Sequence, residues 1–299
     1  MAKVNYLNNK DLFAEILKSK ASYCSFISDE YEQYDGIVMD LNEITPELIQ
    51  ETKEKKAIKM MADDRASQKA SGLKNHQIKV KEITSNDIKD EDLVWRVMTY
   101  DHIPLAPGRV TTPKKEKDNY TQLLFRPFKH FIKDGSSYKE VGRSHWVGGL
   151  SNGHFSQDHG KMTNKLGNMF VMLVERYSQR PNWRGYTYVD EMKCRAHLQF
   201  SSSGLQFDES RSDTPNPFAY YTQMAQNSFT CVLNLEKKNQ KFRDDSLIMN
   251  GATPSFTRQV EHEMAIRGEE FNERHGIVPS DVVVIKKGFT RPSKKPAGK

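Results

Sequence analysis

Three stretches between residues 163 and 245 carry apolar side chains at helical spacing, and they constrain the fold more than any other feature of the sequence. In residues 163–181 the stripe ends before Pro181 and consists of Leu166, Met169, Phe170, Leu173, Val174 and Tyr177. In residues 185–200 one side carries Val189, Met192, Ala196 and Phe200. Each such stripe must be buried against another element, so the spacing predicts a compact helical bundle.

The third stretch opens with NPFAYYTQMAQNSF, residues 216–229. Asn216 is a typical N-cap residue and Pro217 suits the first helical position, so we expect a helix to begin here. The apolar stripe of this helix is Phe218, Tyr221, Ala225, Phe229, Val232 and Leu235. The stripe assigns the last three of these residues to the core, whereas Tyr220, Gln223 and Asn227 project from other faces.

The polar side chains of this third helix have the chemistry of a site for melted DNA. Aromatic rings stack on unpaired bases at about 1–3 kcal/mol per base, and amides bond to base edges. Arg211 precedes the helix, and the basic residues that follow are Lys237, Lys238, Lys241 and Arg243. Each cation that neutralises a phosphate adds salt-dependent affinity. From the residues alone, DNA contact and an ordinary aromatic core remain alternatives for this segment.

The rest of the sequence predicts three further parts. Residues 1–85 are expected to form helices and a linker, with a first helix whose spaced positions are Leu12, Phe13, Ile16, Leu17, Lys20, Tyr23, Cys24 and Ile27. A second helix is expected to begin with Thr45 as its cap and Pro46 at its first position, and residues 62–82 are expected to be its fraying end or a linker. Residues 86–160 contain four prolines and many turn residues, which indicates an irregular connector with a small hairpin within 138–155.

The C-terminal part, residues 246–299, is expected to contain a polar helix at 257–274, a short strand at DVVVIKK (281–287) and a basic tail. The predicted domains are therefore 1–85, 86–160, 161–245 and 246–299. The fold class is mainly α with minor β structure.

Composition narrows the class of protein. The mean hydropathy is −0.75, and no run approaches the roughly 20 apolar residues that a membrane-spanning helix needs. The N-terminus shows no secretory signal, and the three cysteines suggest neither disulfides nor a zinc site, so we expect a reducing cytoplasm. A net charge of +6 is compatible with nucleic acid as a partner.

The succession LGNMFVMLVERY, WRGYTYVDEMKCRAHLQF, FDESRSDTPNPFAYYTQMAQNSFTCVLNLEKKNQ resembles region 2 of bacterial sigma factors, most closely the late-transcription sigma factors of tailed bacteriophages. The resemblance covers about residues 163–245. It implies a sigma region 2-like helical bundle and a non-enzymatic factor without cofactor. Such a factor recruits a multisubunit RNA polymerase to late promoters in the cytoplasm of the infected bacterial cell.

The resemblance also implies roles by position. The surface that binds the clamp coiled coil of the largest polymerase subunit would contain Val189, Asp190, Glu191 and Arg195. Bases of the melted non-template strand and its flanking phosphates would be contacted by Phe218, Tyr220, Tyr221, Gln223, Asn227, Thr230, Arg211, Lys237, Lys238 and Lys241. The chain departs from housekeeping sigma factors, which have a tryptophan pair where Met224 and Ala225 stand. Its basic tail also differs from the apolar and acidic segment that binds a sliding clamp.

Several alternatives stay open. Thr187 and Asp190 have the spacing of a capping box, which would give Asp190 a purely structural role. Glu191 and Arg195 are spaced for an ion pair along the helix. A single-stranded DNA-binding protein is a second function for the same residues. A third is a metal-dependent nuclease built from His145, His154, Asp158 and His159. For residues 1–160, masking of DNA binding, a phage coactivator site and a further polymerase contact are all compatible with the sequence.

Overall fold

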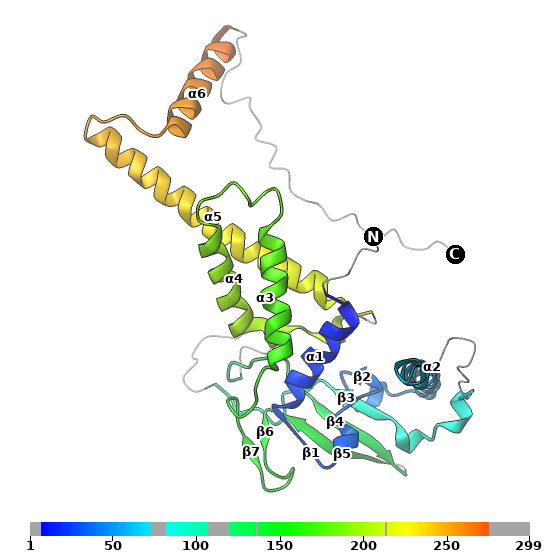
Figure 1. The fold of residues 1–299 in the computed structure, drawn as a ribbon. Helices are drawn as coiled ribbons and strands as arrows, with labels where there is room; N and C mark the ends of the chain where they lie inside the picture. Colours follow the sequence, from blue (N-terminus) through cyan, green and yellow to red (C-terminus); the bar gives the residue numbers. More distant parts are fainter. Residues whose placement is uncertain (1–6, 73–81, 107–119, 136, 213, 275–299) are drawn as a thin grey trace. The chain divides into compact units, whose positions relative to one another are not determined.

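The computed structural model describes residues 7–72, 82–106, 120–135, 137–212 and 214–274 (Figure 1). Helices predominate over a small mixed sheet in these ranges, so the predicted mainly α class with minor β structure is confirmed. The chain forms two compact units, residues 1–232 and 233–299, and helix α5 (Pro217–Met249) contributes to both.

The first unit contains a five-stranded sheet in the order β1-β5-β4-β3-β2. Its strands are β1 (Cys24–Phe26), β2 (Gly36–Val38), β3 (Val94–Val97), β4 (Lys129–Asp134) and β5 (Ser137–Ser144). Neighbouring strands are antiparallel except β2 and β3, which are parallel. The boundary expected near residue 85 is not found, because β1 and β2 pair with strands from the region beyond it. The expected irregular connector supplies three of its strands, β3, β4 and β5.

Helix α2 (Pro46–Ala70) joins the two parallel strands, because parallel neighbours require a crossover connection. As predicted, Pro46 is its first residue and the Thr45 side chain accepts a hydrogen bond from the Leu48 backbone N–H at 3.3 Å. The helix extends to Ala70, into the segment expected to be its fraying end or a linker. Beneath it lies a cluster of buried residues, Val38, Ala57, Ile88, Leu93, Trp95 and Val97. Gly36 is needed beside this cluster, since a Cβ there would lie 2.4 Å from the Trp95 ring.

A two-stranded ladder follows the sheet, formed by β6 (Trp146–Val147) and β7 (His154–Phe155). It lies within residues 138–155, so the predicted hairpin is confirmed. His145, just before β6, is buried and has a backbone φ of 53°, a conformation that few residues other than glycine adopt.

The helices of the first unit are α1 (Asn9–Ala21), α3 (Asn164–Ser178), α4 (Val189–Ser203) and the start of α5 (Figure 1). Helix α1 contacts both α3 and β1. It ends earlier than its spacing predicted, so Tyr23 and Cys24 lie outside it and Ile27 is exposed. All six predicted stripe residues of α3 are buried, as are Met192, Ala196 and Phe200 of α4. Val189 is half-buried.

Helix α5 begins as predicted, with the Asn216 side chain accepting from the Ala219 backbone N–H at 3.1 Å. Of its expected stripe, the buried residues are Tyr221, Ala225, Phe229 and Val232. Leu235 was expected in the core, but it is 55% exposed and belongs to the second unit. The stripe therefore ends where the first unit ends, because only that part of α5 has a bundle to cover it.

A buried charge network connects the sheet with the helical part of the first unit. Glu209, in the short turn η7 (Glu209–Arg211), accepts from Lys20 of α1 at 2.5 Å and from Arg96 of β3. The Arg96 guanidinium lies between the rings of Tyr34 and Phe128, at 3.9 and 3.8 Å from their centroids. All three charged side chains are at most 4% exposed. The network thus joins residues that are more than 100 positions apart.

The second unit contains the remainder of α5 and helix α6 (Phe256–Arg274), which confirms the helix predicted at 257–274. The Asp244 carboxylate accepts from the Ser255 backbone N–H at 2.9 Å and from its hydroxyl at 2.7 Å. These bonds fix the chain between the two helices. The predicted strand at 281–287 and the basic tail lie outside the described residues. No helix in the described ranges combines the length and apolar character needed to cross a bilayer.

Candidate nucleic-acid interface

A groove of about 360 Å³ lies between α4 and α5. Helix α4 contributes Arg195, Gln199 and Ser203, which share one face because they are four residues apart. The rest of the lining is Gln206, Tyr220, Gln223, Met224, Asn227, Ser228 and Cys231. Three residues of the predicted DNA-binding set, Tyr220, Gln223 and Asn227, are thereby brought together. We call this site the α4/α5 groove.

The amides of the α4/α5 groove are held in place by bonds along each helix. Gln223 donates from Nε2 to Asn227 Oδ1 at 3.0 Å, and Gln199 donates from Nε2 to Ser203 Oγ at 3.2 Å. A side-chain amide has two donor hydrogens and an acceptor oxygen, so one internal bond leaves further capacity. The groove therefore presents oriented donors and acceptors of the kind that bond to base edges.

Tyr220 lies where the α4/α5 groove meets a smaller hollow of about 220 Å³ that is also lined by Arg211. Its ring packs edge-on against Phe207 and Tyr221, with centroids 5.5 and 5.1 Å apart. The residue is only half-buried. Burial raises the pKa of its phenol, and nearby Arg211 partly opposes this effect. Tyr220 therefore presents a neutral, supported ring that an unpaired base can stack on.

Arg211 is exposed beside this ring and donates from Nε to Asp208 Oδ2 at 3.2 Å. Burial works against ionisation of the Asp208 carboxyl, but hydrogen bonds from Ser210 and the charges of Arg126 and Arg211 outweigh it and lower its pKa. Asp208 is consequently charged at neutral pH and orients the Arg211 side chain. Part of the positive charge of Arg211 is already compensated by this partner.

The prediction that Tyr221 contacts DNA is wrong. Tyr221 has no exposed surface, and its ring packs against Phe170 and Phe200, with centroids 4.7 and 5.8 Å apart. Its hydroxyl donates to the Gly204 carbonyl inside the bundle. One step along a helix rotates the side chain by about 100°, so Tyr220 and Tyr221 cannot face the same surroundings.

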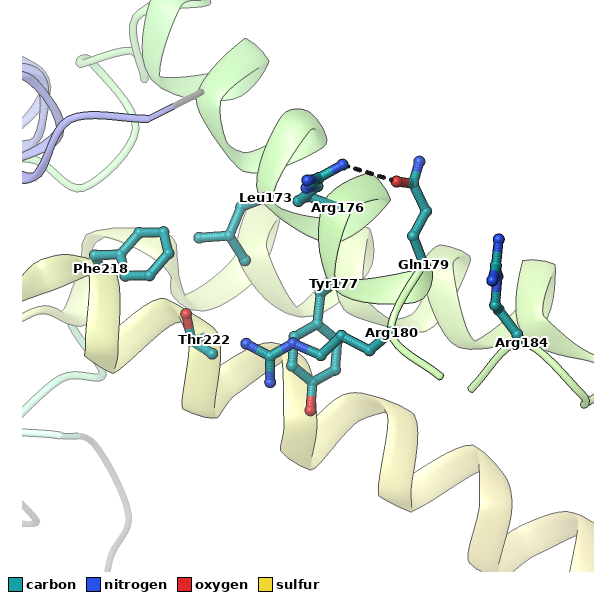
Figure 2. A pocket seen from close by; sticks show the side chains of 8 residues that line it. All are labelled: Leu173, Arg176, Tyr177, Gln179, Arg180, Arg184, Phe218 and Thr222. Carbon is teal, nitrogen blue, oxygen red and sulfur yellow. Dashed lines mark hydrogen bonds between the residues drawn. The ribbon is translucent and has the colours of Figure 1, made fainter. Parts of the chain in front are cut away.

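Phe218, the third ring of the segment, lines a different hollow, of about 500 Å³, at the end of α3 (Figure 2). The other lining residues are Leu173, Arg176, Tyr177, Gln179, Arg180, Arg184 and Thr222. We call this site the arginine hollow. The three rings expected to act together therefore have three separate surroundings. Thr230 is half-buried and lines none of these three hollows.

The residues predicted to bind polymerase divide between two surfaces. Asp190 and Glu191 are exposed at the start of α4, and Asp190 pairs with Lys193 at 3.2 Å. The capping box with Thr187 is not formed, because the N-cap residue is Tyr188 and makes no side-chain cap bond. Arg195 lines the α4/α5 groove, and within the described residues it forms no ion pair with Glu191.

Lys237, Lys238 and Lys241 are exposed on the part of α5 that belongs to the second unit. None of them lines the α4/α5 groove or the two other hollows. Their predicted contact with phosphates stays a prediction.

The histidines singled out as a nuclease centre do not form a site. His145 is buried against Phe125, with ring centroids 4.2 Å apart, whereas His154, Asp158 and His159 are exposed. Burial, with smaller contributions from His102, His159 and Lys20, lowers the pKa of His145 to about 3. Across the ranges that the structure describes, no three His, Cys, Asp or Glu side chains are placed to hold a metal ion. His145 is a neutral core residue.

Sequence reasoning missed several lining residues. Gln199 and Ser203 follow Arg195 at four-residue intervals, a signal that identifies the polar face of α4. Arg180 and Arg184 lie in the loop after α3, where no periodicity reports on burial or neighbours.

Comparisons with models of protein families, with curated proteins and with solved structures find no match to this chain.

Proposed function

We propose that this chain is a sigma-like transcription initiation factor of a bacteriophage. In this proposal the helices of the first unit serve as a sigma region 2-like bundle that recruits a multisubunit RNA polymerase to late promoters in the infected cell. The motifs between residues 163 and 245 motivate the proposal. The α4/α5 groove supports it, because a half-exposed ring, amides and an arginine line it together.

The proposed division of labour differs from that expected from the sequence. Tyr220 receives an unpaired base of the non-template strand, and Gln223 and Asn227 bond to base edges of a −10-like element. Tyr221 supports Tyr220 from the core and does not touch DNA. At the start of α4, Asp190 and Glu191 offer exposed carboxylates to the clamp coiled coil of the polymerase.

The direct test replaces Tyr220 with Ala and assays promoter opening with core polymerase on phage DNA by permanganate footprinting. Loss of one stacking contact of about 1–3 kcal/mol predicts an open-complex population reduced roughly 5- to 150-fold. Binding to core polymerase, measured by pull-down, should stay unchanged because the start of α4 is intact. The matched control is Tyr120→Ala, which removes a half-buried tyrosine that lines none of the three hollows.

Two outcomes would reject parts of this proposal. Unchanged promoter opening by the Tyr220 variant would remove the role assigned to the α4/α5 groove. Failure of the unaltered protein to bind core polymerase, together with tight binding to random single strands, would instead identify a single-stranded DNA-binding protein.

A further inference from the structure

The arginine hollow has the size of a ligand site. Its volume of about 500 Å³ is within the range of small-molecule sites, roughly 300–1,000 Å³. One wall is the end of α3 with the loop that follows, and the other is the first turns of α5, which supply Phe218 and Thr222 (Figure 2). The arginine hollow and the α4/α5 groove share no lining residue, so they are separate sites in the first unit.

The charge of this hollow is one-sided. Its eight lining residues include three arginines and no Asp or Glu. Arg176 lies in the last turn of α3, where a cation stabilises the helix end, and it donates to Gln179 Oε1 at 3.3 Å. Arg180 and Arg184 lie beyond the helix, are exposed, and form no ion pair within the described residues. Helix stability therefore accounts for Arg176 but not for the other two.

The hollow is also partly preorganised. The Arg180 guanidinium lies over the Tyr177 ring, 4.4 Å from its centroid, and extends along that ring toward α5 (Figure 2). Tyr177 is itself held in the core against Phe229, with centroids 5.2 Å apart. Phe218 is fixed at the start of α5, where its backbone N–H donates to Asn9 Oδ1 of α1 at 3.1 Å. Ordering these groups before binding lowers the entropic cost of capturing a ligand.

We propose that the arginine hollow binds a nucleoside phosphate, present either as a free nucleotide or as one unit of a nucleic-acid strand. Planar guanidinium groups bond to phosphate oxygens in pairs, which suits Arg180 and Arg184. The half-exposed Phe218 ring supplies a surface for the base, and the Thr222 hydroxyl can bond to the sugar or phosphate. An acidic peptide would use the charges but not the ring, so it is the less complete match.

The test compares Arg180→Gln/Arg184→Gln with the unaltered full-length protein, without polymerase, so that the result is independent of promoter activity. The control Arg65→Gln/Lys69→Gln removes the same charge from exposed positions on α2. The probes are ATP, measured by calorimetry, and a labelled random 12-nucleotide DNA strand and a 12-residue polyglutamate peptide, measured by fluorescence anisotropy. Thermal melting checks folding, and Arg184→Gln alone replaces the double variant if that variant melts early.

We expect the hollow variant to lose at least tenfold in affinity for ATP, for the strand or for both, while the control changes less than twofold. Loss for ATP alone identifies a free nucleotide, and loss for the strand alone identifies a unit of nucleic acid. In the strand case the slope of log affinity against log salt should also fall by about 1.4, because two phosphate contacts are removed. Phe218→Leu should weaken the same probe but leave inorganic triphosphate binding unchanged.

The proposal is overturned if the hollow variant binds both ATP and the strand within twofold of the unaltered protein. It is equally overturned if only the polyglutamate peptide loses affinity, since the hollow would then be a site for acidic polypeptide.

Discussion

Two of the contacts between arginine and aromatic side chains in the first unit, those of Arg96 and Arg180, have opposite consequences. Arg96 lies between the rings of Tyr34 and Phe128 in the interior, and the Glu209 carboxylate neutralises it. Arg180 lies over the ring of Tyr177 at the surface, and no acid lines its hollow. The contrast indicates that an arginine packed on a ring has a structural role when a buried carboxylate neutralises its charge. When none is present, the cation remains available to an external anion.

The electrostatics of the interior site follow from two cations sharing one carboxylate. Burial disfavours an ionised Glu209, but the charges of Lys20 and Arg96 outweigh it and lower the pKa of the carboxyl. Burial also lowers the pKa of Lys20, and the attraction and hydrogen bond of Glu209 only partly compensate, while the positive charge of Arg96 lowers the pKa further. Glu209 is thus the residue on which the interior network depends.

Glu209→Gln should cause the largest loss of stability, because it leaves the two buried cations of the interior site without their anion. Removing one partner of a buried ion pair costs about 3–5 kcal/mol. We expect the free energy of unfolding, measured by urea denaturation at pH 7.5, to fall by that amount. Glu191→Gln, at an exposed position, is the control and should change it by less than about 0.5 kcal/mol. A loss below about 1 kcal/mol for Glu209→Gln would mean that the network contributes little.

Acidification should lower the free energy of unfolding through the buried His145, by a smaller amount than Glu209→Gln does. The pKa of buried His145 is about 3 in the folded chain, against about 6.5 when unfolded, so unfolding takes up a proton as the pH falls below 6.5. The free energy of unfolding therefore carries no penalty from His145 above pH 6.5 and decreases progressively as the pH falls toward 3. Between pH 7.5 and 5 the loss amounts to about 2 kcal/mol.

His145→Asn removes this titration, and Asn tolerates the positive φ of position 145. We expect the difference in unfolding free energy between pH 7.5 and 5 to shrink by about 2 kcal/mol, again from urea denaturation. The exposed His154→Asn variant should leave the difference unchanged. Guanidinium groups keep their charge over this range, so strand binding by the arginine hollow should not follow the same pH profile. An unaltered pH dependence in His145→Asn would show that His145 does not titrate as its burial implies.

Tyr221→Phe should have the smallest effect on stability, and it distinguishes the structural role of Tyr221 from the DNA contact proposed for Tyr220. It removes the hydroxyl that donates to the Gly204 carbonyl, which should lower the unfolding free energy by about 1 kcal/mol. Binding to single-stranded DNA, measured by fluorescence anisotropy, should not change, because the residue has no exposed surface. A loss of DNA affinity without a loss of stability would return Tyr221 to the interface.

Local patterns were sufficient for much of the fold. Thr45 and Asn216 cap their helices as predicted, because capping depends on bonds between residues two or three positions apart. The stripe of α3 is buried at every predicted position, since a 3.6-residue period specifies a face whatever covers it. The same reasoning failed at Leu235, because the apolar spacing of α5 continues to this residue but the helices that cover the earlier part of α5 do not reach it.

The sequence by itself therefore determined where the main helices begin, which faces of α3 and α4 are apolar, and that rings, amides and cations are concentrated in residues 211–243. Only the tertiary structure decided that Tyr220 is half-exposed while Tyr221 is sealed, that β1 and β2 join later strands in one sheet, and that Glu209 binds Lys20 and Arg96. The physical reason is range. Helix periodicity and capping are set by neighbours within one turn. Ion pairing, strand pairing and exposure depend instead on residues that are distant in the chain, 59 positions apart for Gly36 and Trp95 and 189 for Lys20 and Glu209.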